Sequence, residues 1–196
     1  SSPFNAEIQK AVELYNETKN IQAFDIYFDK MFYQNVSKSL RSENDQDISH
    51  VFGMEIDFYN VMSVVRGKFW GLDDERIQDL SCSATLNIPN QVMDRMRAAE
   101  SVKDALDELA STRYKDLVPE TEDEVEAIAE FEHAFEMGYY KAINGSFSKM
   151  FSFATVIGIS KLIGYEGRNI GAIAFAVEQK IPVETTMSKL IIKEAE

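Results

Sequence analysis

Residues 55–72 read EIDFYNVMSVVRGKFWGL, and this stretch decides the fold class of the chain. Its density of Val, Met and Phe predicts a long helix over about residues 48–70 that is buried on most sides. Gly71 is expected to end the helix, because glycine readily adopts the left-handed conformation of a helix C-terminus. The stretch therefore predicts a core helix with a defined end.

The rest of the chain shows the same helical period. Apolar residues recur at i, i+3, i+4 and i+7 through residues 8–15 and again through 21–32. A polar run and the segment around Pro119 are expected to break the helices, and Pro182 is expected to open the last one. No convincing strand alternation is present, so the sequence predicts an all-α fold. Later helices are expected over about residues 92–109, 120–144, 147–163 and 166–180.

Composition restricts the possible functions. The 196 residues include 20 basic and 33 acidic ones, for a net charge of −13, which argues against binding to nucleic acid. Hydrophobic residues make up 45%, enough to exclude a disordered chain. The single cysteine, Cys82, can form neither an internal disulfide nor a Cys-x-x-Cys metal site. No stretch of 18 apolar residues is long enough to span a bilayer.

Two motifs occur twice in the same order. An aromatic helix pattern begins at Phe24 and again at Phe131, 107 residues later. An acid-x-x-Asn motif occurs at Asp57 and Asn60 and again, 109 residues later, at Glu166 and Asn169. The order and nearly constant offset predict two sister helical modules. Chance similarity between apolar helical stripes is the alternative interpretation.

The sequence suggests roles for the residues of these motifs. The four polar residues of the two acid-x-x-Asn motifs are expected to form hydrogen bonds to neighbouring helices and fix their register, a structural role. Arg66 and Lys68, beside Trp70, have two interpretations: a tip that binds a partner, or cations whose stems lie along a core helix, which the apolar surroundings favour. Gly167 and Gly171 are expected to allow close helix packing.

Catalytic signals are weak. Each of the two histidines follows a carboxylate by three residues, as Asp47-x-x-His50 and Glu130-x-x-His133. This spacing occurs in carboxylate-bridged di-iron bundles, so a helical di-metal oxidoreductase is one alternative function. Such a site needs further inward carboxylates, and an acidic chain produces this spacing by accident. Cys82 lacks a nucleophile signature and no phosphate-binding glycine loop occurs. We expect no catalytic residues, metal or cofactor.

Taken together, these motifs resemble those of a known family. Residues 55–72, followed by Ile77 and Leu80, resemble the acid-x-x-Asn…Arg-Gly-Lys…Gly-Leu pattern of the C subunit of archaeal A-type ATP synthase and its eukaryotic relative, the d subunit of V-ATPase. The helix over residues 24–33 and the segment 110–114 are similar to that family's first helix and linking stretch. The resemblance covers about residues 21–192. The second copy keeps Glu166, Arg168, Asn169 and Ile170 but has Phe175-Ala176-Val177 in place of Arg-Gly-Lys.

The resemblance implies a function without catalysis. The family implies a funnel of three similar helical modules that sits on the membrane proteolipid ring and receives the central shaft of a rotary motor. The chain would then be a peripheral central-stalk component at the cytoplasmic face of the cell membrane, coupling ion flow to ATP synthesis or hydrolysis. A helical scaffold with another partner is a further alternative.

The expected organisation has three parts. Residues 1–90 are expected to form the first helical module, residues 91–118 linking helices, and residues 119–196 the second module. The resemblance implies three modules where two copies are visible. Together with the absence of an initial methionine, this suggests a truncated chain or a strongly diverged third module.

Overall fold

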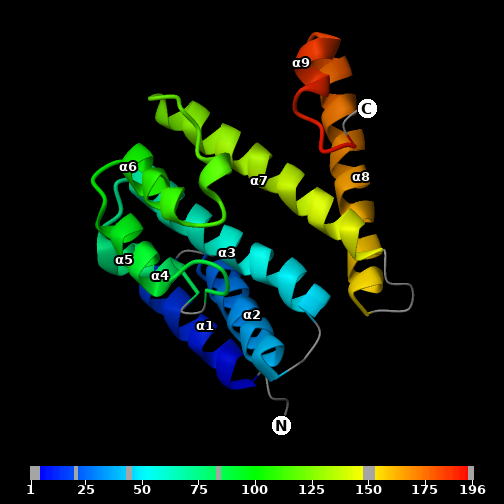
Figure 1. Cartoon of the computed structure of the whole chain (residues 1–196). Coiled ribbons are helices and arrows are strands. Elements are labelled where there is room, and N and C mark those ends of the chain that lie inside the picture. The colour runs from blue at the N-terminus through cyan, green and yellow to red at the C-terminus, as the bar shows by residue number, and fades with distance from the viewer. Residues whose placement is uncertain (1–4, 20–21, 43–45, 83–84, 148–152, 194–196) are drawn as a thin grey trace. The chain divides into compact units, whose positions relative to one another are not determined.

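The computed structural model describes residues 5–19, 22–42, 46–82, 85–147 and 153–193, and all regular secondary structure within these ranges is helical (Figure 1). The predicted all-α fold is thereby confirmed. The long helices are α1 (Asn5–Thr18), α2 (Gln22–Ser42), α3 (Gln46–Phe69), α7 (Glu124–Ser146) and α8 (Phe153–Gln179). The shorter ones are α4 (Asp74–Leu80), α5 (Asn90–Ala98), α6 (Val102–Asp107) and α9 (Val183–Met187), with 3-10 turns η1 (Glu108–Ser111) and η2 (Lys115–Leu117).

The chain divides into two compact units. The first contains residues 1–45 and 52–118, and the second contains residues 46–51 and 119–196, so the first turns of α3 belong to the second unit. The three-part division into residues 1–90, 91–118 and 119–196 stays a prediction.

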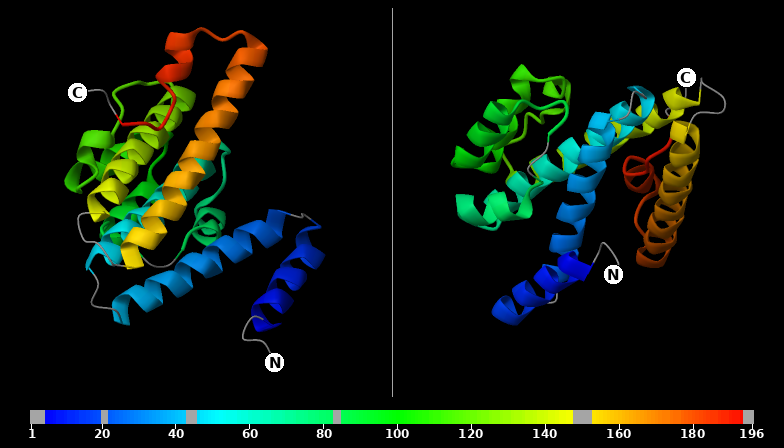
Figure 2. Two further views of the ribbon diagram at one scale, coloured as in Figure 1. Left: turned by 90° about the vertical axis from the view of Figure 1, so that its right-hand side faces the viewer. Right: turned by 90° about the horizontal axis from the view of Figure 1, so that it is seen from below.

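The first unit is built on α3. The helix is buried on most sides, as its sequence predicts. Beside it in the sequence, α1 and α2 pack side by side (Figures 1 and 2), with the rings of Tyr15 and Phe24 5.5 Å apart. The short helices α4, α5 and α6 pack against one another and carry buried apolar residues of their own. Side chains of α3 that are completely buried are Ile56, Val61, Val64 and Val65.

The second unit is built on α7 and α8. The two helices contact each other through a T-shaped pair of rings, Tyr140 and Tyr165, and through a bidentate ion pair between Arg168 and Glu136, one of whose hydrogen bonds measures 2.9 Å. The chain then reverses at Lys180 and α9 packs on α8 (Figures 1 and 2).

One helix prediction was wrong. Residues 147–163 and 166–180 were expected to form separate helices, but α8 runs without interruption from residue 153 to residue 179. Gly164 weakens a helix without breaking it. The contacts of Tyr165 and Arg168 with α7 stabilise helical conformation directly after that glycine, and tertiary packing of this kind outweighs local propensity.

Candidate functional site

Asp57 and Asn60 lie one turn apart on α3 and are completely buried. One carboxylate oxygen of Asp57 accepts a hydrogen bond from the backbone N–H of Leu86 at 3.0 Å. The other oxygen accepts hydrogen bonds from the N–H of Asn87 at 3.0 Å and from the hydroxyl of Tyr114 at 2.8 Å. We call these contacts the Asp57 clamp. They attach to one point of α3 two segments that lie 29 and 57 residues further along the chain.

The electrostatics of the Asp57 clamp favour a structural role. Burial raises the pKa of Asp57 above its ordinary value of 3.8, while the hydrogen bonds from Leu86, Tyr114 and Asn87 oppose that rise. Burial, followed by the neighbouring charge of Asp57, raises the pKa of Tyr114 as well. Because the phenol keeps its proton and donates it to the carboxylate, the pair forms a stable hydrogen bond and has no free base to offer a substrate.

The two asparagines of the repeated motif form the same kind of contact. The side-chain oxygen of Asn60 accepts a hydrogen bond from the N–H of Cys82 at 2.8 Å. The side chain of Asn169 binds both backbone groups of Ile191, accepting from its N–H at 3.0 Å and donating to its carbonyl at 2.7 Å. In both cases the partner lies 22 residues after the asparagine, just beyond a short helix. The partners are backbone groups of these segments.

The acidic residues of the motif differ. Asp57 is buried and accepts three hydrogen bonds, whereas Glu166 is exposed on α8 and has no hydrogen bond or ion pair to any residue that the structure describes. The structure thus places three of the four predicted motif residues in hydrogen bonds and leaves Glu166 in contact with solvent.

The ends of α3 and α8 also correspond. Leu72 N–H donates to the carbonyl of Gly67 at 2.9 Å, and Ile181 N–H donates to the carbonyl of Ala176 at 2.9 Å, 109 residues later. The residue before each donor has a positive φ: +67° at Gly71 and +55° at Lys180. These ends and the matched asparagine contacts support the duplication; that whole modules repeat stays a prediction.

The left-handed conformation of Lys180 leads to a test. A residue with a β-carbon pays about 1 kcal/mol for this conformation relative to glycine. Lys180→Gly is therefore expected to raise the free energy of unfolding by about 0.5 kcal/mol, since the greater freedom of glycine in the unfolded chain offsets part of the gain. Urea denaturation measures the change, with Gly71→Lys as the matched control, which should lower stability. A loss of stability in Lys180→Gly would contradict the assignment of this helix end.

Arg66, Lys68, Phe69 and Trp70 form the last turn of α3 and the residue that follows it, and we call them the α3 tip. Trp70 is 64% exposed and Phe69 43% exposed, Arg66 is exposed and Lys68 is half-buried. Exposed aromatic residues beside arginine are typical of protein-binding surfaces. Of the two roles that the sequence leaves open for this segment, these exposures support partner binding for Trp70.

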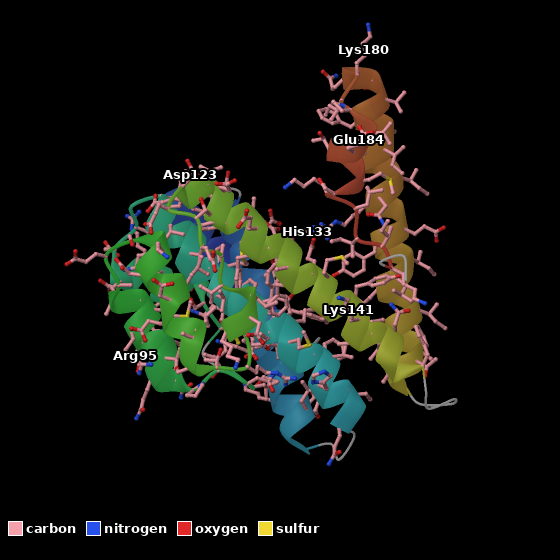
Figure 3. All side chains as sticks on the ribbon, turned by 45° about the horizontal axis from the view of Figure 1, so that its top comes forward. Arg95, Asp123, His133, Lys141, Lys180 and Glu184 are labelled. Carbon is pink, nitrogen blue, oxygen red and sulfur yellow. The ribbon has the colours of Figure 1, made fainter. Side chains whose placement is uncertain are left out.

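The residues of the di-metal alternative do not assemble in the described part of the chain. His50 is half-buried on α3, and His133 is half-buried on α7, where Glu130 is exposed (Figure 3). The side chain of Asp47 lies outside the described residues. Among the side chains that are described, no group of three or more His, Cys, Asp or Glu residues is arranged to hold a metal ion. Geometry therefore adds no support to this alternative.

Two further expectations concern α8 and membranes. A β-carbon added at Gly167 or Gly171 would meet nothing within 4 Å, so the close packing expected of these glycines is absent among the described residues. In the same part of the chain, none of the helices combines the length and apolar character needed to cross a membrane.

Sequence reasoning missed Tyr114 as a partner of Asp57. The two residues are 57 positions apart, and no periodic pattern relates them. Leu86 and Asn87 were missed for another reason: they contribute backbone N–H groups, which carry no signature in the residue types.

Comparison with known proteins gives a consistent result. The profile of the ATP synthase (C/AC39) subunit family matches residues 1–189. The chain is 27% identical to the C subunit of the A-type ATP synthase of Pyrococcus horikoshii over 172 residues, which cover 84% of this chain and 46% of that protein. It is 25% identical to the same subunit of the A-type ATP synthase of Methanocaldococcus jannaschii over 191 residues, 94% of this chain and 48% of that protein. The chain thus spans about half the length of these relatives. No solved structure matches it.

Proposed function

Because the chain belongs to the ATP synthase (C/AC39) subunit family, we propose that it acts as a non-catalytic central-stalk (rotor) subunit of an A- or V-type ATP synthase. In this role it couples the proteolipid ring to the central shaft during ion-driven ATP synthesis or hydrolysis. It is a peripheral component at the cytoplasmic face of the membrane, held there through the ring, and it needs no cofactor of its own.

The family match is the observation that carries this proposal, and the geometry of α3 is compatible with it. A rotor component that transmits torque needs stiff elements. The Asp57 clamp and the Asn60 contact attach α3 to the segments that follow it, so a force on the α3 tip is passed to a well-packed unit. The exposed Phe69 and Trp70, beside Arg66 and Lys68, supply a surface of the kind that binds another protein.

A binding experiment tests the role and the tip together. The chain is immobilised and exposed to purified proteolipid ring and, separately, to purified central-shaft subunits. We expect one of them to be retained, and Trp70→Ala to weaken that retention by about tenfold or more, because aromatic anchors carry much of the energy of an interface. Val125→Ala, at a residue that is 62% exposed on α7, is the control and should bind as the wild type does.

The outcomes separate the role from the choice of surface. If folded protein retains neither the ring nor the shaft, the proposed role is wrong. Retention that is unaffected by Trp70→Ala leaves the role intact and shows that another surface makes the contact. The same preparation is expected to hydrolyse no ATP alone, and hydrolysis that persists through further purification would contradict a non-catalytic role.

A further inference from the structure

A row of apolar side chains runs along α8 and is exposed over its whole length. Its positions are separated alternately by three and four residues, which is the spacing of the a and d positions of a coiled coil. The six apolar members are between 43% and 74% exposed, and the seventh and central position is a glutamate. We call this row the α8 seam; its members are Val156, Ile159, Ile163, Glu166, Ile170, Ile173 and Val177.

The α8 seam is separate from the side of the helix that packs within its own unit. Ala154, Tyr165 and Ala176 are buried, and Asn169 binds Ile191. At 100° per residue this buried side lies about a third of a turn from the seam. The exposed fractions of the seam residues therefore describe an unoccupied face, and a contiguous apolar face of this length is typical of an interaction surface.

A second observation on the same helix indicates that another helix packs there. Gly164, Gly167 and Gly171 form a row beside the seam, and a β-carbon added at any of them would meet nothing within 4 Å. Glycine inside a helix lowers its stability relative to alanine, and here no described neighbour makes use of the missing side chain. The glycines leave room for a second backbone to approach α8 closely.

We propose that the α8 seam binds one helix of a partner, which carries its own apolar residues at alternating three- and four-residue spacing and an arginine or lysine that faces Glu166. Glu166 is the only charged residue in the seam. Covering its carboxylate without a partner would leave a buried, unpaired charge, which is strongly unfavourable. A cation at the facing position removes that cost and sets the register, as single polar residues do in coiled coils.

The charge of the seam argues against a second copy of this chain as the occupant. Glu166 is the central position of the row, so parallel pairing in register and antiparallel pairing about its midpoint both place Glu166 against Glu166. The net charge of −13 adds repulsion between copies and favours a basic partner. This inference concerns a surface that the proposed function does not use, so the two can fail separately.

The test uses the whole chain and two synthetic helical peptides of about three heptads. Both peptides have Ile and Leu at the a and d positions, and they differ only at the residue that faces Glu166, which is Arg in one and Glu in the other. Fluorescence anisotropy is expected to show binding of the Arg peptide at least about tenfold tighter than that of the Glu peptide. Glu166→Lys is expected to invert this preference.

Variants of the seam locate the binding surface. Ile163 and Ile170 are 63% and 62% exposed, so the double variant Ile163→Ser/Ile170→Ser should keep the fold, which circular dichroism verifies. It is expected to weaken binding of the Arg peptide by about tenfold or more. Phe175, 58% exposed on the side of α8 away from the seam, provides the matched control: Phe175→Ser should bind as the wild type does.

Several results would overturn the proposal. One is no binding of the Arg peptide, or equal binding of both peptides. Another is binding that the double variant leaves unchanged. Sedimentation velocity that shows a dimer of the wild type, lost in the double variant, would identify a second copy as the occupant. Binding to lipid vesicles that depends on Ile163 and Ile170 would identify a membrane surface instead.

Discussion

Asp57→Ala is expected to lower the free energy of unfolding by about 3 kcal/mol, which is a large part of the stability of a domain of this size. The substitution leaves the N–H groups of Leu86 and Asn87 and the hydroxyl of Tyr114 without their acceptor. Because an unsatisfied buried donor costs about 1–3 kcal/mol and Leu86 and Asn87 are half-buried, the sum lies below the maximum for three such groups. Urea denaturation followed by circular dichroism measures the loss.

Asp57→Asn is the matched control, because an amide has the same shape and keeps an oxygen acceptor. Its oxygen can accept from both backbone N–H groups, and its NH2 group can donate to the hydroxyl of Tyr114. We therefore expect a loss of less than about 1 kcal/mol. If Asp57→Asn were as harmful as Asp57→Ala, the carboxylate charge, and not the set of hydrogen bonds, would be what the fold requires.

The same pair of proteins gives a pH dependence with a defined sign. Burial raises the pKa of Asp57 in the folded state, so the folded state binds this proton more tightly than the unfolded state does. The resulting stabilisation is fully present below pH 3.8 and is lost as the pH rises through the folded-state pKa. The free energy of unfolding of the wild type minus that of Asp57→Asn should therefore decrease with rising pH in that range. An increase would show that the hydrogen bonds outweigh burial.

Gly67→Ala is expected to lower the free energy of unfolding by about 1–2 kcal/mol. A β-carbon at this position would lie 2.6 Å from the Cγ1 atom of Ile77, a side chain that is completely buried and cannot easily move aside. Alanine normally stabilises a helix relative to glycine by about 1 kcal/mol, so the clash must outweigh that gain. The midpoint of urea denaturation measures the net effect.

Gly171→Ala on α8 provides the opposite case. It also lies inside a helix, but its added β-carbon would meet nothing within 4 Å, so a gain of up to about 1 kcal/mol is expected. A loss at Gly67 together with a gain at Gly171 would show that the two glycines have different roles. Equal gains at both positions would contradict the close approach of Ile77 to α3.

Residue patterns predicted the elements well and their partners poorly. The core helix α3 and its end at Gly71 follow from the spacing of apolar residues and one glycine, both of which are local properties. The break expected between residues 163 and 166 was wrong because contacts of Tyr165 and Arg168 with α7 stabilise that part of the helix. Local propensity is weak compared with such contacts, so helix existence is easier to predict than helix length.

The acid-x-x-Asn motif shows the same limit at the candidate site. Its two occurrences are equivalent in sequence, and both asparagines bind backbone 22 residues further along the chain. Their acidic residues nevertheless have opposite surroundings, since Asp57 is buried under three donors and Glu166 is exposed. The motif identifies the position, while the segments that pack over it determine what the carboxylate does.

By itself, the sequence determined that this protein is an all-helical, strongly acidic chain with a duplicated pattern and a resemblance to one family, because helical period, charge and motif order are written in consecutive residues. The tertiary structure alone decided which carboxylate is buried, that Tyr114 binds it from 57 residues away, and that the isoleucines of α8 are exposed. Burial and hydrogen bonding depend on which distant segments meet, and the free energy of those contacts is a property of the folded chain as a whole.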